Sequence, residues 1–493
     1  MKPVTEAILD LFGSAHSLEQ PSGYRGLAAF HKYWGKKPLD SLEYLVNLLS
    51  KPGDLIVDPF LGFGLLARRV ALLDRKFVGI DINPISIQLA TLFLTPPDWR
   101  EYANALKRIE EKVRPSIEDS YRLEDGRTAT HYLWNGETLA SVWIAGKKGT
   151  ARVEMAPTKH DLRMVKQYAD CKTDLLRAPR FFKNSRINVN TDLTFKNIFA
   201  GRALRNIDLL LKTIAEEPES LRRALLLTLT SSVGQMSKMV FAISKRGKVV
   251  GSTAEKMEVG SWVIGYWRPR VHFEVNVWNT YLNRANRLRK ALKEELTPQQ
   301  IHPVYDVRHF YSGGSQVCLV NGDCRSTLQS MIGDSVDLMI TDPPHSDRIP
   351  YLELSEMWNC ILGESPDFEN EIVVSNAPKR RKNKEMYNLD MGDFMDKASL
   401  VLGEGGLLAL MFNARDDKSW TYFHSYTSGQ KPLTFLGTFP IKYSAASVVQ
   451  DNRGGALKYD YILVFAKGGP RTGIVERLAS ISGWTNSMPR NGD

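Results

Sequence analysis

The segment LIVDPFLGFG occupies residues 55–64, and it predicts how this chain folds. Leu55–Asp58 is an apolar run typical of a buried strand, and it ends in an acid, a proline and two closely spaced glycines. Leu65–Leu73 then has the pattern of a helix. Glycines at a strand-to-helix turn let the backbone approach a ligand that lies beyond the carboxyl end of the strand. The segment therefore predicts the first unit of a parallel α/β sheet, with a ligand site at its edge.

A second strand and an acid follow this turn. Phe77–Asp81 is the next strand candidate, and Ser86–Phe93 is the next helix. An acid at the end of such a strand can accept hydrogen bonds from both hydroxyls of a ribose. The glycine loop departs from the GxGxxG pattern, because no third glycine stands at the fitting offset after Gly64. An ordinary turn is the alternative, but the strand that ends on Asp81 favours a nucleoside cofactor.

The segment VDLMITDPPH, residues 336–345, carries the second signal. Its apolar strand, Val336–Thr341, ends abruptly in an acid and two prolines, so Asp342 is presented at the edge of the sheet. Proline lacks an N–H donor, which leaves carbonyl oxygens to accept hydrogen bonds. The Asp342 carboxylate and the Pro343 carbonyl can thus each accept one N–H of an amino group. The alternative is a strand that simply terminates in a proline turn.

The order of predicted elements indicates one domain interrupted by another. Further strand candidates are Gln316–Val320, Gly406–Phe412, Leu433–Pro440 and Tyr459–Phe465. Between the two blocks, the sequence predicts a small antiparallel sheet, several helices and an aromatic-rich stretch: Arg122–Val153, Leu193–Ile214, Leu221–Ser244, Ser261–Tyr281 and the basic, exposed helix Val277–Glu295. We therefore predict an α/β fold class, a Rossmann-like seven-stranded sheet interrupted by a large α+β insert. The expected boundaries are 1–97 and 313–469 for the two parts of the main domain, 98–312 for the insert and 470–493 for a loosely ordered tail.

Composition narrows the class of protein. The chain has 493 residues, of which 43% are hydrophobic, and a net charge of +10, which fits a polyanion-binding protein or simply a basic one. Its four cysteines form no CxxC pair, so we expect neither a disulfide framework nor a metal site. No apolar run approaches the ~20 residues that span a bilayer, and the first 20 residues do not resemble a signal peptide. We expect a cytoplasmic protein without a membrane partner.

These segments together resemble the amino-methyltransferase family that modifies adenine N6 or cytosine N4 in DNA. Asp58–Gly64 matches the family's DPFxGxG cofactor motif. Asp342–His345 matches its catalytic motif, in which Asp, Asn or Ser precedes Pro-Pro and an aromatic residue, except at the last position. The resemblance also includes His31–Pro38, Asn321–Asp323 and Asp451–Tyr461, and it covers roughly residues 28–97 and 316–467. It implies a methyltransferase domain, S-adenosyl-L-methionine as cofactor, double-stranded DNA as substrate, and a cognate restriction or defence protein as a candidate partner.

The resemblance also implies roles for matched positions. Asp58 would face the methionine amino group of the cofactor, Asp81 the ribose and Asp323 the adenine amino group. The remaining positions would shape or close the pocket or flank the adenine ring, and the full cofactor-binding set is Trp34, Lys37, Asp58, Phe60, Gly62, Gly64, Asp81, Ile82, Pro84 and Asp323. For Ile82 and Pro84, packing of the turn is the alternative.

The predicted catalytic set is Asp342, Pro343, Pro344 and His345. An exocyclic amino nitrogen is a poor nucleophile, because its lone pair is delocalised into the ring. Hydrogen bonds to the carboxylate and the Pro343 carbonyl would localise that lone pair for in-line attack on the methyl group. His345 stands where the family has an aromatic residue that stacks on the flipped base, and a planar imidazole can stack there. No Pro-Cys dipeptide is present, which argues against C5-cytosine chemistry.

Several charged residues have open interpretations. Base flipping costs a few kcal/mol and needs backbone contacts. Two basic segments offer them, with a solvated charge run as the alternative: Lys379, Arg380, Arg381, Lys382 and Lys384 in a loop, and Lys245, Arg246 and Lys248 in the insert, which we expect to recognise DNA. We interpret His31 as structural, Glu353 and Glu356 as a polar helix face, and the aromatic stretch as insert core.

The function predicted from the sequence is site-specific DNA methylation, with adenine N6 favoured because the motif begins with Asp. The alternatives are a cytosine N4 enzyme, an RNA methyltransferase, and a module that binds cofactor or DNA without transferring a methyl group.

Overall fold

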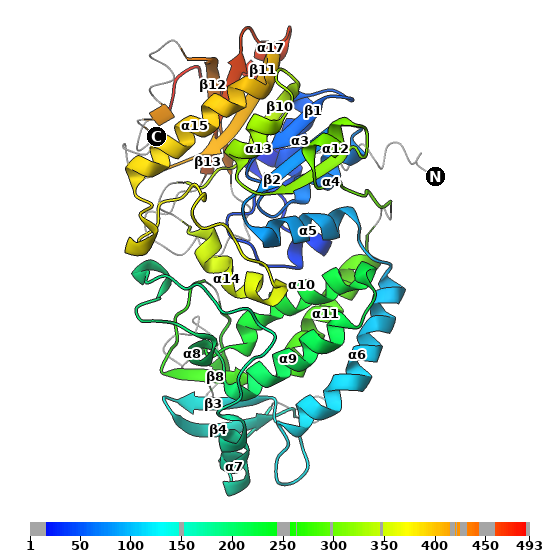
Figure 1. Ribbon diagram of the computed structural model, residues 1–493, viewed down its shortest axis with the longest axis vertical. Coiled ribbons are helices and arrows are strands. Elements are labelled where there is room, and N and C mark those ends of the chain that lie inside the picture. Colours follow the sequence, from blue (N-terminus) through cyan, green and yellow to red (C-terminus); the bar gives the residue numbers. More distant parts are fainter. Residues whose placement is uncertain are drawn as a thin grey trace.

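The computed structural model describes residues 16–146, 152–243, 257–262, 264–295, 299–345, 349–414, 420, 422–423, 431–442 and 459–489. A large sheet covered by helices occupies one end of the molecule, and a group of helices with a smaller sheet occupies the other (Figure 1). Among the helices formed by these residues, none combines the length and apolar character needed to span a bilayer.

The large sheet contains seven strands, and all seven were expected. They are β1 (Leu55–Asp58), β2 (Lys76–Asp81), β9 (Val317–Asn321), β10 (Val336–Thr341), β11 (Leu402–Phe412), β12 (Leu433–Lys442) and β13 (Tyr459–Lys467). Their order is β12-β13-β11-β10-β1-β2-β9. The five strands from β11 to β9 pair in parallel, whereas β13 is antiparallel to both of its neighbours. This mostly parallel sheet is consistent with the predicted Rossmann-like fold.

Helices cover both faces of this sheet. One face packs against α12 (Val307–Tyr311), α13 (Cys324–Ser330) and α15 (Lys384–Val401). The other face packs against α3 (Leu39–Leu49), α4 (Leu65–Leu72), α5 (Pro84–Leu94) and α17 (Ile474–Ala479). Neighbouring residues of one strand enter opposite cores, as Ile56 and Val57 do in β1. Because both faces are buried, the strands are continuous apolar runs rather than alternating ones.

The sheet has a switch point between β1 and β10. The chain passes from β1 to β2 and β9 on one side, and from β10 to β11 on the other, while β1 and β10 pair directly. Loops that leave the carboxyl ends of two such strands diverge and open a crevice for ligands. Asp58 ends β1, and Asp342 follows β10 at the same edge.

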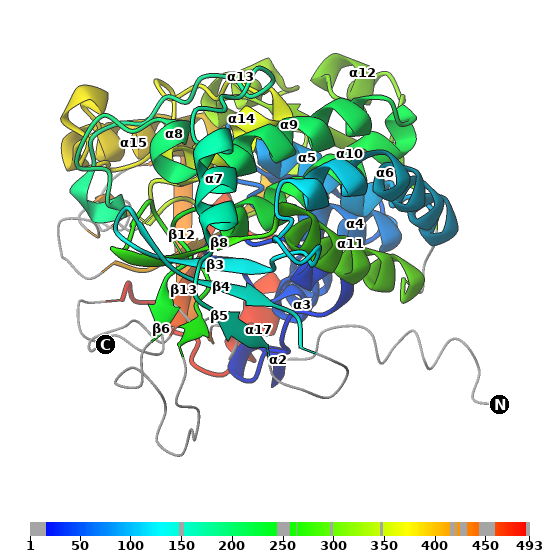
Figure 2. The same ribbon diagram turned by 90° about the horizontal axis from the view of Figure 1, so that it is seen from below.

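The segment between β2 and β9 builds most of the other end of the molecule. Its main helices are α6 (Trp99–Asp119), α7 (Lys159–Tyr168), α8 (Phe195–Ile198), α9 (Gly201–Ala215), α10 (Glu219–Val233) and α11 (Val277–Lys293). A four-stranded sheet, β5-β4-β3-β8, lies against them (Figure 2). Its strands are β3 (His131–Asn135), β4 (Thr138–Ile144), β5 (Val153–Met155) and β8 (Val271–Val275), and a separate pair consists of β6 (Ala242–Ile243) and β7 (Glu258–Val259).

Two predicted helices in this segment were partly wrong. The helix expected to continue to Ser244 ends at Val233, and a short strand follows it. The helix expected to be exposed is α11, and one of its faces is buried, including Trp278 and Tyr281. The aromatic stretch does contribute to the core, except for Trp267, which is exposed.

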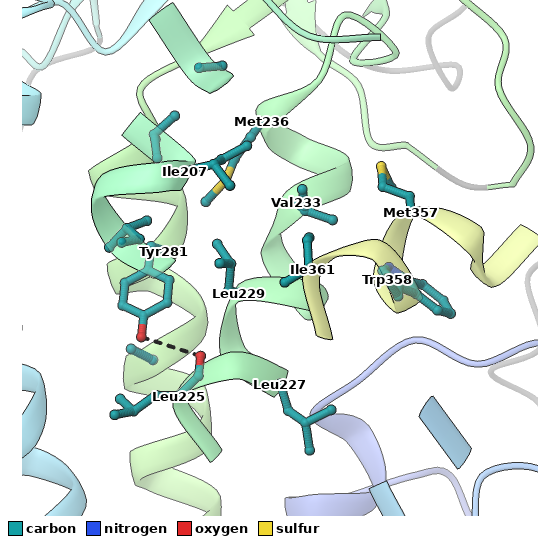
Figure 3. Packing of buried hydrophobic residues seen from close by; sticks show 14 of the residues in the cluster. Ile207, Leu225, Leu227, Leu229, Val233, Met236, Tyr281, Met357, Trp358 and Ile361 are labelled. Atoms are coloured by element: carbon teal, nitrogen blue, oxygen red, sulfur yellow. Dashed lines mark hydrogen bonds between the residues drawn. The ribbon is translucent and has the colours of Figure 1, made fainter. Parts of the chain in front are cut away.

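Helix α14 (Tyr351–Leu362) joins the two ends of the molecule. Its Ile361 points toward Leu229 and Val233 of α10, whereas Trp358 points away from α10 on the other side of the helix (Figure 3). Trp34, from the segment before α3, stacks on Trp358 with ring centroids 4.8 Å apart. The core of residues 98–312 is therefore continuous with that of α5 and α14. Whether this segment recognises DNA stays a prediction.

The expected boundaries at 312 and 470 differ from the packing. Before 312, Ile301 and Phe310 are buried against the large sheet rather than in the helical end. After 470, the chain forms α17, and Thr485 exchanges two backbone hydrogen bonds with Thr438 of β12, of 2.7 and 2.9 Å. Since Leu478 is fully buried, residues 470–489 are packed rather than loosely held.

Candidate active site

A cavity at the carboxyl edge of the sheet brings the two sequence motifs together. Its lining includes these predicted residues: Trp34, Lys37, Asp58, Phe60, Gly62, Gly64, Asp81, Ile82, Asp323, Asp342 and Pro344. Pro84 is absent from the lining, because it begins α5 and is buried there. Pro343 and His345 are also absent. The cavity therefore unites most of the cofactor set with the acid of the catalytic motif.

Thr341 connects the two motifs directly. Its hydroxyl donates a hydrogen bond of 2.7 Å to Asp58 Oδ1, and it accepts one of 3.2 Å from the Phe60 amide. Thr341 is fully buried, so this connection lies inside the protein. The sequence analysis missed this role, although the residue directly precedes Asp342.

The carboxylate of Asp81 holds the glycine turn. Asp81 Oδ2 accepts the Gly62 amide at 2.7 Å, and Oδ1 accepts the Asn83 amide at 2.8 Å. Gly62 and Gly64 have φ angles of +56° and +78°, in the left-handed region that favours glycine. The acid at the end of β2 therefore fixes the loop that follows β1.

Burial raises the pKa of both Asp58 and Asp81 to about 7, and the carboxylates of Asp81 and Asp342 contribute to the rise in the pKa of Asp58. Asp323 lies further along the cavity, where it caps α13 and accepts from Arg325 Nε at 3.0 Å. Three carboxylates thus line one side of the cavity. This acceptor set fits a ligand that presents ammonium, hydroxyl and amino donors, as S-adenosylmethionine does.

A pH dependence of cofactor affinity follows from these pKa values. Both carboxylates are protonated below pH 7 and ionised above it, so acceptors are lost as the pH falls. From pH 8 to pH 6, we expect affinity for S-adenosylmethionine to fall about tenfold for each carboxylate, or about 100-fold for the pair. Isothermal titration calorimetry measures this change. In Asp58→Asn the dependence should shrink to about tenfold, and a flat profile in the unsubstituted protein would contradict the assignment.

Asp342 is held by charged and polar groups on two sides. Its Oδ2 lies 2.8 Å from Lys37 Nζ, and its Oδ1 lies 2.9 Å from His345 Nε2. Lys37, expected to close the cofactor pocket, therefore also pairs with the predicted catalytic acid. The neighbouring Pro344 carbonyl accepts a 2.6 Å hydrogen bond from the hydroxyl of Tyr387, on α15.

The structure does not support base stacking by His345. Its imidazole is directed at Asp342 and packs against Phe412, with ring centroids 5.3 Å apart, and only 7% of the side chain is exposed. Asp460 of β13 lies 3.6 Å from its other ring nitrogen. The motif alone could not indicate this orientation, because Phe412 and Asp460 come from distant strands.

Sequence reasoning missed several residues of the cavity, among them Tyr33, Asn83, Tyr351, Asn370 and Glu371. Asn83 accepts from Asn359 Nδ2 at 3.0 Å and donates to Ser355 Oγ at 2.9 Å, so it attaches the turn after β2 to α14. Glu371 is buried and 2.7 Å from Arg380, and burial raises its pKa. No local pattern around these residues marks them.

The acids of α14 do not form the expected polar helix face. Glu353 and Glu356 are buried, with 2% and 0% exposed. Glu356 accepts two hydrogen bonds from Arg177, of 3.0 and 3.1 Å. Glu353 lies 3.1 Å from Arg380 Nη1. His31 is structural, as expected: it is buried, its Nε2 lies 3.0 Å from Thr230 Oγ1, and burial lowers its pKa to about 3.

The predicted basic loop divides into buried and exposed residues. Arg380 is paired with Glu353 and Glu371 inside the protein, and the Lys382 ammonium lies 3.5 Å from Asp390 with 9% of the side chain exposed. These two residues therefore hold the loop rather than face a partner. Lys379 and Arg381 are exposed, and Lys384 is half-buried. Lys245, Arg246 and Lys248 lie outside the described residues.

Comparison with known proteins agrees with this geometry. Residues 7–91 match the N6_N4_Mtase model, described as DNA methylase. Over 49 residues the chain is 41% identical to "Type II methyltransferase M.EcaI" of Enterobacter cloacae. This match covers 10% of this chain and 11% of that protein. The match to the family model supports the resemblance to DNA methyltransferases of adenine N6 and cytosine N4 over residues 7–91, and the short match to M.EcaI agrees with it.

The matched segment spans about one tenth of the length of that relative. A solved structure, "Crystal Structure of PH0851", covers 38% of this chain and 40% of its own at 10% identity. Its TM-score is 0.18, which is too low to bear on the fold.

Proposed function

We propose that this protein transfers a methyl group from S-adenosylmethionine to an exocyclic amino group in double-stranded DNA, with adenine N6 as the favoured target. The observation that carries the proposal is the shared cavity, in which Asp342 opens onto the same space as the carboxylates of Asp58 and Asp81. The cofactor would supply an electrophilic methyl group on sulfur. The three carboxylates described above would hold it by its amino and hydroxyl donors.

In this proposal Asp342 orients the target amino group. Of its side chain 21% is exposed, and a carboxylate has about four lone-pair positions, so it can accept an N–H in addition to its two internal partners. The resemblance gives the second N–H to the carbonyl of Pro343, which is buried and is not among the residues that line this cavity. These two bonds localise the nitrogen lone pair, and the fixed acceptors need no rearrangement during transfer. The C–N bond would form as the bond between the methyl carbon and sulfur breaks, and one N–H proton would then leave to water. No covalent intermediate with the protein is required.

The assay is transfer of labelled methyl groups to duplex DNA, to duplex RNA and in the absence of polymer. Incorporation into DNA alone supports the proposal, and incorporation into RNA supports the RNA alternative. Cofactor binding without transfer to either polymer supports the non-catalytic module. Hydrolysis of methylated DNA to nucleosides then separates N6-methyladenine from N4-methylcytosine.

The two exposed residues of the basic loop, together with the half-buried Lys384 at the start of α15, are the candidate DNA contact. We expect the triple variant Lys379→Ala, Arg381→Ala and Lys384→Ala to bind DNA about tenfold to 100-fold more weakly at low salt. The slope of log affinity against log salt should fall by about 2.7, because each phosphate contact contributes about 0.9. Fluorescence anisotropy with a labelled duplex measures both quantities. An unchanged slope would show that these residues are a solvated charge run.

A further inference from the structure

The surroundings of Asp342 form a closed ring of alternating acids and bases. From Asp342 Oδ1 the ring passes to His345 Nε2 at 2.9 Å, and from His345 Nδ1 to Asp460 Oδ1 at 3.6 Å. From Asp460 Oδ2 it passes to Lys37 Nζ at 2.8 Å, and from Lys37 back to Asp342 Oδ2 at 2.8 Å. The four residues come from three parts of the chain that are far apart in sequence.

Three members of the ring are buried, and two, Asp342 and Lys37, line the cavity. The exposed fractions of the side chains are 0% for Asp460, 6% for Lys37 and 7% for His345, against 21% for Asp342. A buried carboxylate is costly without partners, so Asp460 is stable here because cationic and polar groups flank it. Asp460 in turn draws Lys37 and His345 inward. The ring therefore fixes the orientation of the one acid that faces the substrate side.

The position of Lys37 in the ring distinguishes between a metal site and an internal cation. The ligand atoms of Asp342, His345 and Asp460 lie within 4.8 Å of one another, a grouping that could hold a metal ion. However, Lys37 Nζ lies 2.8 Å from both carboxylates, where a bound cation would compete with it. The cation between these acids is thus the lysine ammonium.

We infer that His345 is a positioning residue of the active site, which donates Nε2–H to Asp342 while its Nδ1 side packs near Asp460. This inference rests on the proposed function, because it assigns His345 to the acid that binds the target amino group. A donor that fixes one carboxylate oxygen keeps the carboxylate's remaining lone pairs directed at the cavity. The contribution of His345 is a hydrogen bond and not a stacking surface.

Three substitutions at His345 separate the effect of its hydrogen bond from the effect of its planar imidazole. The amide nitrogen of Gln occupies about the position of Nε2, so His345→Gln keeps a donor for Asp342. His345→Asn places its amide near Nδ1 and loses that donor, and His345→Phe keeps a planar ring without any donor. We expect kcat for DNA methylation to stay within about threefold in His345→Gln and to fall about tenfold to 100-fold in the other two. KM for DNA and affinity for S-adenosylmethionine should change little in all three.

The opposite ranking would overturn the inference. If His345→Phe retained activity while His345→Gln lost it, the ring would act by stacking on the base, and KM for DNA would report that loss. If all three variants were as active as the unsubstituted protein, His345 would have no role in positioning. If the unsubstituted protein failed to methylate DNA, the proposed function would fail. A second readout would still test the hydrogen bond from His345 to Asp342.

That second readout needs no activity. With ¹⁵N-labelled histidine, the ring nitrogens of His345 can be assigned among the nine histidines by their disappearance in His345→Gln. We expect a protonated Nε2 and a shift of both ring signals in Asp460→Asn. An Nε2 without a proton would overturn the inference. Signals that change on addition of Mg²⁺ or Zn²⁺, and revert with a chelator, would show a metal in place of the lysine.

Discussion

Asp342→Ala is expected to lower kcat for methyl transfer about 1000-fold while leaving affinity for S-adenosylmethionine within a few-fold. Alanine removes both oxygens that could accept from the target amino group, whereas Asn, which the resembling family also has at this position, would keep one. A fixed hydrogen-bond partner of a reacting group contributes about 10²- to 10³-fold. Single-turnover assays with labelled cofactor measure the rate, and calorimetry measures the affinity.

Asp334→Asn is the control for loss of an acid beside the same strand. Asp334 precedes β10 at the end opposite to Asp342, and 73% of its side chain is exposed, although it pairs with Lys467. Its φ of 55° is one that Asn also adopts, so the exchange adds little strain. Loss of an exposed ion pair has a small effect, so activity should be unchanged. If both variants lost activity equally, or if Asp342→Ala remained active, Asp342 would not be the group that binds the amino nitrogen.

Gly64→Ala is expected to lower the free energy of unfolding by about 3 kcal/mol, from strain and overpacking together. Gly64 has a φ of +78°, which an L-residue with a Cβ adopts only with strain. A Cβ at this position would also lie 2.5 Å from Ala90 Cβ and 3.0 Å from Ala90 Cα, on α5. The glycine is therefore needed for close approach of the turn to that helix. Thermal unfolding should show a lower midpoint, by roughly 3 °C.

Gly62→Ala separates the backbone strain from the overpacking. Gly62 also has a positive φ, of +56°, but a Cβ there would meet nothing closer than Tyr33 Cε1, at 3.7 Å. We expect this variant to lose only the conformational part, about 1–2 kcal/mol. Equal destabilisation by both substitutions would show that contact with Ala90 is not the reason for Gly64.

The large sheet could be predicted from local sequence because its strands are short apolar runs buried on both faces. β1 and β10 have the predicted bounds, and the other five strands differ by a few residues at their ends. The helical end was predicted less well, since surface-facing and core-facing residues mix in α11. Helix α6 was missed altogether, although its apolar residues recur at helical spacing from Tyr102 to Ile117.

The sequence by itself determined the two motifs at the carboxyl edge of the sheet, because each consists of a strand and the turn that follows it. Only the tertiary structure decided what surrounds them. Asp460 and Lys37 lie more than 400 residues apart in the chain, yet both contact the predicted catalytic site. Likewise, the sequence shows Arg380 only as part of a basic run, whereas in the structure it is buried and paired with Glu353 and Glu371. Local periodicity predicts strands and turns, whereas ion pairs between distant segments depend on how the whole chain packs.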